Sequence, residues 1–213
     1  MFLIFLVFNS IFFLPPAIYS GNITIFKSQI DTIDITGFSK CGLTSRWFRT
    51  QFSPFLTNFK EIPKGLKIVY HPLAIGSKLV NGSKVATCEN GWLECQLNKL
   101  QCCSKKYITD ESHPINLLKI ITCIQGKSKL EDGISCLPET EIGEKIQNCS
   151  KSQEGEDLLI AEPFPHNESI TLPWIKINGI RSLEATKNLQ SVVCSLPSAK
   201  KASPCLPAEE MVL

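Results

Sequence analysis

In the stretch TIDITGFSKCGLTSRWF, residues 32–48, the spacing of apolar residues changes from that of a strand to that of a helix. Residues 32–36 alternate apolar and polar side chains, which is typical of a β-strand with one buried face. From 45 to 59 apolar residues recur at spacings of three and four, which predicts a helix, although Pro54 is expected to kink or break it. Cys41 therefore falls between the predicted strand and the predicted helix.

Three later segments extend this pattern. LKIVYHPLAIG, residues 66–76, predicts a second strand that runs into a loop. TLPWIKINGI, residues 171–180, predicts two short strands around a hairpin turn at 178–179, because Asn-Gly readily takes the positive φ values of that turn. Residues 182–196 predict a helix with Ser182 as its N-cap.

A cysteine-rich insertion at about residues 77–160 separates the second strand from the hairpin, with helical character near 94–106 and 116–125. The order of elements is the thioredoxin plan with its central connection expanded. We therefore expect the α/β class, a thioredoxin-like fold with a long disulfide-rich, partly helical insertion. No Pro/Gly/Ser-rich linker divides the chain, so one domain is expected at 32–206, followed by a tail at 207–213.

The N-terminus has the pattern of a secretory signal peptide. Residues 1–20 contain no charged side chain and carry a short apolar run over 2–14, which predicts cleavage near Ser20. An uncleaved anchor is the alternative, but polar residues at 9–10 interrupt the run, and a spanning helix needs about 20 apolar residues. We expect an N-terminal extension at 21–31 and no stable membrane insertion after cleavage.

Two further features agree with passage through the secretory pathway. Four Asn-x-Ser/Thr sequons predict glycosylation, at Asn22, Asn81, Asn148 and Asn167. In the third sequon the middle residue is Cys149, whose pairing would hide the acceptor. The chain has ten cysteines, and an oxidising compartment predicts that most of them form disulfides.

Composition disfavours several classes of function. The formal charge is +2 and the basic pairs at 105–106 and 200–201 are too sparse for a phosphate-binding face, so no nucleic-acid partner is expected. No metal is expected either, because the cysteine spacings do not match zinc knuckles and His71, His113 and His166 lack partners at metal-ligand spacing. The chain has no Gly-x-Ser-x-Gly motif and no glycine-rich phosphate loop, and we expect no cofactor.

CENGWLECQLNKLQCC, residues 88–103, is similar to the signature of the gamma-interferon-inducible lysosomal thiol reductases, Cys-Gln-His-Gly-x2-Glu-Cys-x2-Asn-x4-Cys. Six positions match, at Cys88, Gly91, Glu94, Cys95, Asn98 and Cys103. Glu89 replaces Gln, Asn90 replaces His, and Cys102 is additional. LPWIKING and the last two cysteines also resemble the C-terminal part of the family, so the resemblance covers about residues 32–206.

The resemblance implies a secreted or lysosomal glycoprotein that reduces disulfides in proteins being degraded at acid pH. It also implies a Cys-x-x-Cys site, in which Cys41 is the first cysteine and Thr44 stands in place of the second. Pro173 takes the place of the cis proline that faces the redox cysteine in thioredoxin-like proteins. The alternatives are an edge-strand proline in trans and a Cys41 that is bridged to another cysteine.

Setting aside Cys41 and Cys102 leaves eight cysteines, enough for four bridges: Cys88, Cys95, Cys103, Cys123, Cys136, Cys149, Cys194 and Cys205. We expect Cys194 to pair with Cys205, because prolines between them can turn the chain back on itself. The sequence does not resolve the pairing of the other six. For Cys102 we favour a free thiol over a distant replacement for the missing resolving cysteine.

Two functions remain open. The first is a thiol–disulfide oxidoreductase in which Cys41 attacks disulfide-containing polypeptides from the start of a helix, where backbone N–H groups favour a thiolate. Thr44 would donate a hydrogen bond to that thiolate, and small-molecule thiols would resolve the mixed disulfide. The second is a non-catalytic thioredoxin-like module that binds unfolded or cysteine-containing polypeptides.

Overall fold

The computed structural model describes residues 30–109, 113–165 and 171–206. The predicted signal peptide, nearly all of the predicted extension and the tail lie outside these residues, as do Asn22, His166 and Asn167.

Four strands form the central sheet, in the order β2-β1-β5-β6. β1 (Asp31–Gly37) pairs in parallel with β2 (Leu66–Pro72) and antiparallel with β5 (Trp174–Ile177), which turns back into β6 (Ile180–Arg181). The turn at 178–179 has positive φ at both residues. The predicted strands and the predicted hairpin are therefore confirmed.

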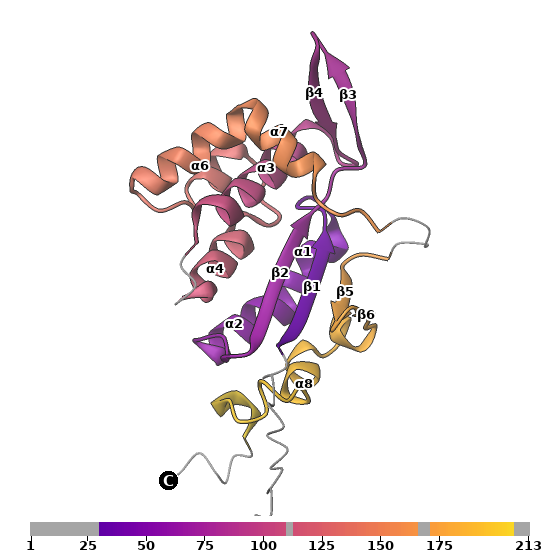
Figure 1. Cartoon of the computed structure of the whole chain (residues 1–213), viewed down its shortest axis with the longest axis vertical. Helices are drawn as coiled ribbons and strands as arrows, with labels where there is room; N and C mark the ends of the chain where they lie inside the picture. Colours follow the sequence, from indigo (N-terminus) through magenta and orange to yellow (C-terminus); the bar gives the residue numbers. More distant parts are fainter. Residues whose placement is uncertain (1–29, 110–112, 166–170, 207–213) are drawn as a thin grey trace, which may run out of the picture.

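A helical run follows β1 and covers one face of the sheet (Figure 1). It consists of α1 (Gly42–Trp47), a wider π-helical turn, η1 (Phe48–Phe52), and α2 (Ser53–Phe59). Pro54 lies in the first turn of α2, where a missing N–H is tolerated. The expected interruption thus takes the form of a widened turn immediately before the proline.

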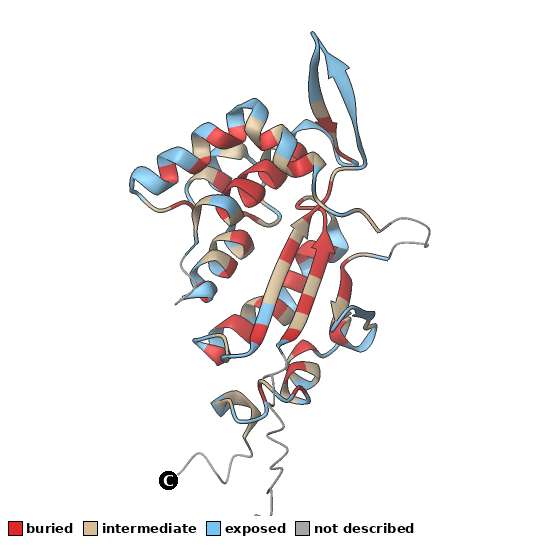
Figure 2. Ribbon diagram, viewed as in Figure 1, coloured by how far each residue is buried: buried red, intermediate tan, exposed pale blue. Residues whose placement is uncertain are grey.

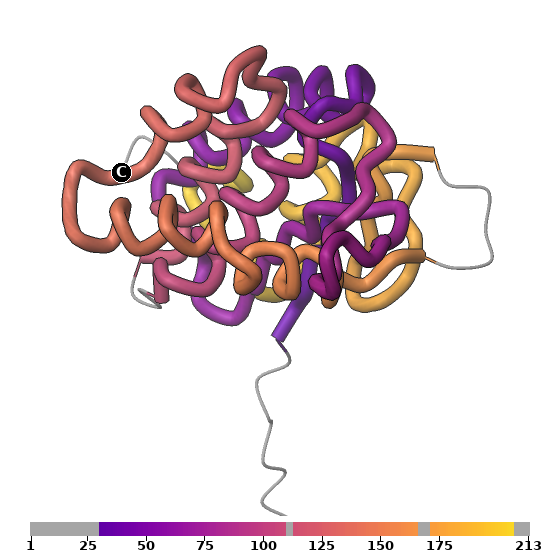
Figure 3. Tube along the Cα trace, turned by 90° about the horizontal axis from the view of Figure 1, so that it is seen from above, coloured from indigo at the N-terminus to yellow at the C-terminus, as the bar shows by residue number. Residues whose placement is uncertain are grey.

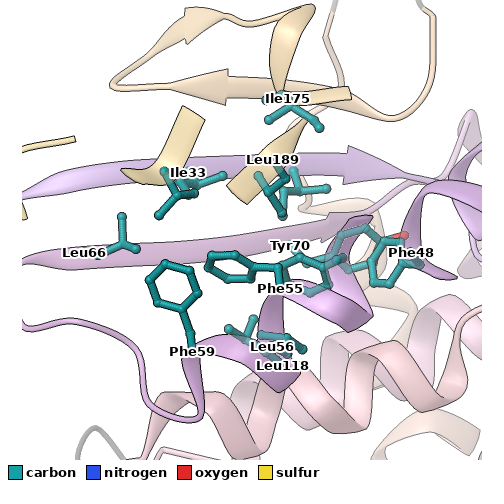
Figure 4. Packing of buried hydrophobic residues seen from close by; sticks show 14 of the residues in the cluster. Ile33, Phe48, Phe55, Leu56, Phe59, Leu66, Tyr70, Leu118, Ile175 and Leu189 are labelled. Carbon is teal, nitrogen blue, oxygen red and sulfur yellow. The ribbon is translucent and has the colours of Figure 1, made fainter. Parts of the chain in front are cut away.

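The main core lies between this face of the sheet and the helical run (Figure 4). Ile33 and Ile35, the apolar positions of the alternating strand, are almost completely buried. Five aromatic side chains surround them and are buried as well: Phe48, Phe52, Phe55, Phe59 and Tyr70. Burial of each large apolar side chain contributes about 1.5–3 kcal/mol, so this cluster dominates the packing of the strand–helix unit.

The insertion is partly helical, as predicted, and also contains two strands. It begins with an unpredicted hairpin of β3 (Gly76–Val80) and β4 (Ser83–Thr87), which projects from the body and is largely exposed (Figure 2). Its described residues then form five helices: α3 (Trp92–Tyr107), α4 (Pro114–Ile124), α5 (Leu130–Ile134), α6 (Glu141–Lys151) and α7 (Gln153–Ile160). The two helical segments predicted from sequence are α3 and α4, whereas α5, α6 and α7 were not predicted.

The insertion has its own apolar cluster, which includes Leu97, Leu100, Ile124 and Ile146. Seen from above, most of its helices and the strands β5 and β6 lie on opposite sides of the N-terminal strand (Figure 3). The molecule is therefore an α/β protein with a thioredoxin-like fold and a helical insertion.

The predicted helix at 182–196 is wrong as a continuous element. A short 3-10 helix, η2 (Glu184–Thr186), precedes α8 (Leu189–Cys194), and η3 (Ser203–Cys205) follows. Ser182 Oγ accepts a hydrogen bond from Ala185 N–H, but the N-cap residue of η2 is Leu183, so Ser182 is not the N-cap of a longer helix. Asn188 caps α8 by accepting from Ser191 N–H at 3.2 Å, because a short polar side chain competes well for helix N-termini. Within the described ranges, no helix combines the length and the apolar character needed to cross a bilayer.

Candidate functional site

Cys41 is the N-cap residue of α1. Its backbone is extended (φ −67°, ψ 124°), and its carbonyl accepts a hydrogen bond from Ser45 N–H at 2.9 Å. The thiol is free and the residue is partly exposed. A reactive sulfur at this position lies beside the N–H groups of the first helical turn, which lack partners within the helix.

Thr44 is completely buried, and its hydroxyl has no hydrogen-bond partner. Its side chain packs over Gly37, where an added Cβ would lie 2.6 Å from Thr44 Cγ2. The expected hydrogen bond from Thr44 to Cys41 is absent, so this prediction is wrong. The Thr44 side chain packs against Gly37 at the end of β1 instead of bonding to the Cys41 sulfur.

The loop that carries Cys41 is fastened to α3 by Glu94, which is completely buried. One carboxylate oxygen accepts from Lys40 N–H at 3.2 Å and from the Asn90 side chain at 2.7 Å. The other accepts from Asn90 N–H at 3.0 Å, and the Glu94 carbonyl accepts from Ser39 Oγ at 3.3 Å. The residue directly before Cys41 is thus tied to the insertion.

Asn98 and Gln125 complete this attachment. Asn98 Oδ1 accepts from Ser39 N–H at 3.1 Å, and its side-chain amide donates to the Leu73 carbonyl at 2.7 Å. Gln125, which follows α4, donates to the carbonyls of Phe38 and Ser39 at 3.0 and 3.1 Å. Glu94 and Asn98 were noted only as signature positions, and Gln125 was missed, because no local pattern shows which distant loop a polar side chain contacts.

The loop before β5 forms the other side of the site. The Leu172–Pro173 peptide bond is cis. Arg181 donates to the carbonyls of Thr171 at 3.1 Å and Pro173 at 3.2 Å, and its guanidinium lies 4.2 Å from the centre of the Trp174 ring. Arg181 was not predicted, although it lies on β6 directly after the predicted hairpin turn.

α1 and this loop share a cavity of about 260 Å³. Its lining comes from both elements and from the residues that follow β6: Leu43, Arg46, Trp47, Thr50, Thr171, Leu172, Pro173, Arg181, Leu183 and Thr186. We call it the α1–Pro173 groove. It begins two residues after Cys41, so the structure brings the predicted Pro173 to the same helix as the predicted nucleophile.

All ten cysteines lie within the described residues. Eight form four bridges: Cys88–Cys95, Cys103–Cys149, Cys123–Cys136 and Cys194–Cys205. The expected Cys194–Cys205 pair is present. Cys102 is free but buried, and burial raises the pKa of its thiol well above the usual value, with the nearby Glu162 charge adding to the effect.

A charged cluster lies near the C-terminal end of β2. His71 Nδ1 and Glu162 Oε2 are 2.7 Å apart, and Lys105 pairs with the same carboxylate. Burial raises the pKa of the Glu162 carboxyl, but the hydrogen bond with His71 and the Lys105 charge outweigh burial and hold the pKa below its ordinary value. In the part of the chain that the structure describes, no group of three His, Cys, Asp or Glu side chains is placed to hold a metal ion.

Two of the four predicted glycosylation sites can be located. Asn81 is exposed in the turn between β3 and β4, and Asn148 is exposed on α6. In the second sequon Cys149 is bridged and Ser150 is buried. Glycosylation at these positions stays a prediction.

The structure thus combines a thioredoxin-like sheet, a free cysteine at the start of α1, a cis proline in the loop before β5 and four disulfide bridges. The chain matches the family described as gamma interferon inducible lysosomal thiol reductase (GILT) over residues 32–153, more than half of its length. The chain therefore belongs to the GILT family.

Several curated relatives are similar to this chain. A GILT-like protein of Caenorhabditis elegans is 28% identical over 183 residues, which cover 77% of this chain and 79% of the relative. A GILT-like protein of Caenorhabditis briggsae is 27% identical over 201 residues, 88% of this chain and 89% of the relative. A gamma-interferon-inducible lysosomal thiol reductase-like protein of Anopheles gambiae is 30% identical over 134 residues, 57% of this chain and 54% of the relative.

Proposed function

We propose that this protein is a thiol–disulfide oxidoreductase of the secretory pathway, secreted or lysosomal, which reduces polypeptide disulfides through Cys41 by a monothiol mechanism. One observation carries the proposal. Cys41 is the one free cysteine that is partly exposed, while the other free thiol is buried and the remaining eight are bridged.

In the first step the Cys41 thiolate attacks one sulfur of a substrate disulfide. A bond forms between Cys41 Sγ and that sulfur, the substrate S–S bond breaks, and the departing sulfur leaves with the electron pair and takes up a proton. The open N–H groups at the start of α1 favour the negative charge of the attacking sulfur. The attachment of Lys40 to Glu94 fixes the loop from which the attack occurs.

Resolution of the mixed disulfide requires a thiol from outside the chain. Thr44 has no sulfur, and Cys102 is buried with a raised pKa. A small thiol therefore attacks Cys41 Sγ and releases the substrate thiol, and a second small thiol releases Cys41 and forms a small-molecule disulfide. Two small thiols are oxidised for each substrate disulfide reduced.

The replacement of the resolving cysteine by Thr44 also favours a second candidate function. A module that cannot resolve its own mixed disulfide would hold cysteine-containing polypeptides rather than turn them over. In this case added small thiols would release bound chains only slowly.

Trapping with a denatured, disulfide-containing protein tests the proposal. The parent is expected to form a mixed disulfide at mildly acidic pH and to turn over when a small thiol is added. Cys41→Ser should lose both, whereas Cys102→Ser should keep both and serves as the matched control. Capture by Cys41→Ser at the parent rate would contradict the proposal, and capture without thiol-dependent turnover would favour the holding module.

A further inference from the structure

The α1–Pro173 groove combines positive charge with exposed apolar surface. We propose that it selects polypeptide segments with an apolar side chain beside the half-cystine and a carboxylate about two residues away from it. This inference rests on the proposed reductase function and specifies its substrate class.

Two leucines form the apolar part of the groove, one on each side. Leu43 on α1 is 59% exposed, and Leu183 after β6 is 63% exposed. Large apolar side chains left in water next to a reactive cysteine gain free energy when a bound segment covers them. A residue adjacent to the half-cystine reaches Leu43, because Leu43 lies only two positions after Cys41.

One exposed arginine supplies the charge. Arg46 is exposed on α1 and lines the groove, whereas the guanidinium of Arg181 holds the carbonyls of the facing loop. Among the described residues that line the groove, none is acidic. The groove therefore presents a local field that attracts anions.

The spacing of Cys41 and Arg46 sets the register of the carboxylate. Five residues of α-helix advance about 7.5 Å along the axis. An extended polypeptide advances about 3.3 Å per residue, so a side chain about two residues from the half-cystine comes level with Arg46.

The groove would favour some polypeptide segments over others when Cys41 attacks the disulfide, and the chemistry of that attack stays the same. Cys41 Sγ bonds to the half-cystine sulfur, and the partner sulfur leaves with the electron pair. Attraction between exposed opposite charges is modest and screened by salt, so the expected preference is about two- to fivefold in rate at low ionic strength.

Three peptides test the proposal with the full-length protein. They are identical except at the positions two residues before and two residues after a single cysteine, which are both Asp, both Asn or both Lys. The cysteine is presented as its mixed disulfide with thionitrobenzoate, so that attack on the peptide sulfur releases a coloured thiolate. Rates are measured for the parent, Arg46→Glu and Arg49→Glu at mildly acidic pH, where Asp stays ionised. Arg49 is an exposed arginine that follows α1 without lining the groove, so its variant is the matched control.

The parent should react fastest with the Asp peptide and slowest with the Lys peptide. The order should invert for Arg46→Glu, persist for Arg49→Glu, and flatten in concentrated salt. Equal parent rates for the three peptides, or equal inversion by both variants, would overturn the selectivity while leaving the reductase proposal intact. Absence of release from every peptide by the parent, or release by Cys41→Ser at the parent rate, would instead remove the proposed function on which the selectivity rests.

Discussion

The strand–helix unit and the insertion are stabilised in different ways. The strand–helix unit, β1 through β2, packs around a large aromatic cluster, and its one cysteine is the free Cys41. The insertion packs around a smaller apolar cluster and contains three of the four bridges: Cys88–Cys95, Cys103–Cys149 and Cys123–Cys136. Most disulfide bridges thus lie in the region with the smaller apolar core. Cys41 lies in the strand–helix unit, which contains no disulfide bridge.

The contrast has a chemical consequence. A disulfide near Cys41 would offer an intramolecular target to its thiolate, whereas a region stabilised by aromatic packing does not. The two regions meet at Glu94, Asn98 and Gln125, whose hydrogen bonds attach the loop before Cys41 to the bridged insertion. Four changes separate these contributions.

The largest effect is expected from placing a second thiol in the strand–helix unit. Residues 41 and 44 stand three apart across a helical turn, so their separation falls within the ~4.4–6.8 Å between Cα atoms that a disulfide tolerates. Without a small thiol, Thr44→Cys should release about one reduced substrate per chain, because the introduced thiol displaces the substrate sulfur and forms a disulfide with Cys41, whereas the parent stays as the mixed disulfide. With a small thiol present to reduce that internal disulfide, turnover by the variant should exceed that of the parent by at least about tenfold. Single-turnover release without a small thiol and steady-state reduction of a protein disulfide with it measure the two effects. Equal release by parent and variant without a small thiol would mean that the parent already resolves its own intermediate.

Removal of the Cys103–Cys149 bridge should give the largest loss of stability. The bridge closes a loop with a sequence separation of 46 residues, so its loss should lower the free energy of unfolding by about 4 kcal/mol. The double variant Cys103→Ala, Cys149→Ala is measured by urea unfolding under non-reducing conditions. Removal of the Cys194–Cys205 bridge, with a sequence separation of 11, should lower the free energy of unfolding by about 3 kcal/mol. A larger loss from the shorter loop would show that strain or packing, rather than loop closure, decides the ranking.

Breaking the junction between the two regions should have an intermediate effect. Glu94→Ala leaves the N–H groups of Lys40 and Asn90 without their charged acceptor in a part-buried setting, which should cost about 2 kcal/mol. The Cys41 alkylation rate should also change, because the loop before it is released. Glu156→Ala, which removes the ion pair with Lys99 from the same helix bundle, is the control for stability loss alone. If Cys41 in Glu94→Ala were alkylated at the parent rate, the hydrogen bonds of Glu94 would not control the loop before Cys41.

The strand, the helical run and the second hairpin were predictable because their apolar periods and the Asn-Gly turn are local. Cys41 was predictable from its place between the first strand and the helix, and Pro173 from the family resemblance of the segment before the hairpin. The hairpin β3–β4 was missed, although residues 81–82 repeat the Asn-Gly signal with positive φ. The roles of Glu94 and Arg181 were not predictable, because each acts on a backbone segment that only the folded chain brings near.

The smallest effect concerns pH and the carboxylate that joins the end of the insertion to β2. The pKa of Glu162 is depressed below its ordinary value of 4.5, so its ionised form contributes stability in full above that value and loses it as the pH falls through the folded pKa. Glu162→Gln should therefore be less stable than the parent near neutrality and should converge with it in acid, as followed by thermal unfolding between about pH 7 and pH 3. Glu141→Gln is the surface control, since Glu141 pairs with Lys145 on an exposed turn of α6 and should change the curve much less. A gap between parent and Glu162→Gln that stayed constant across this range would assign the contribution of Glu162 to packing, and the ion cluster with His71 and Lys105 would then not couple the two regions electrostatically.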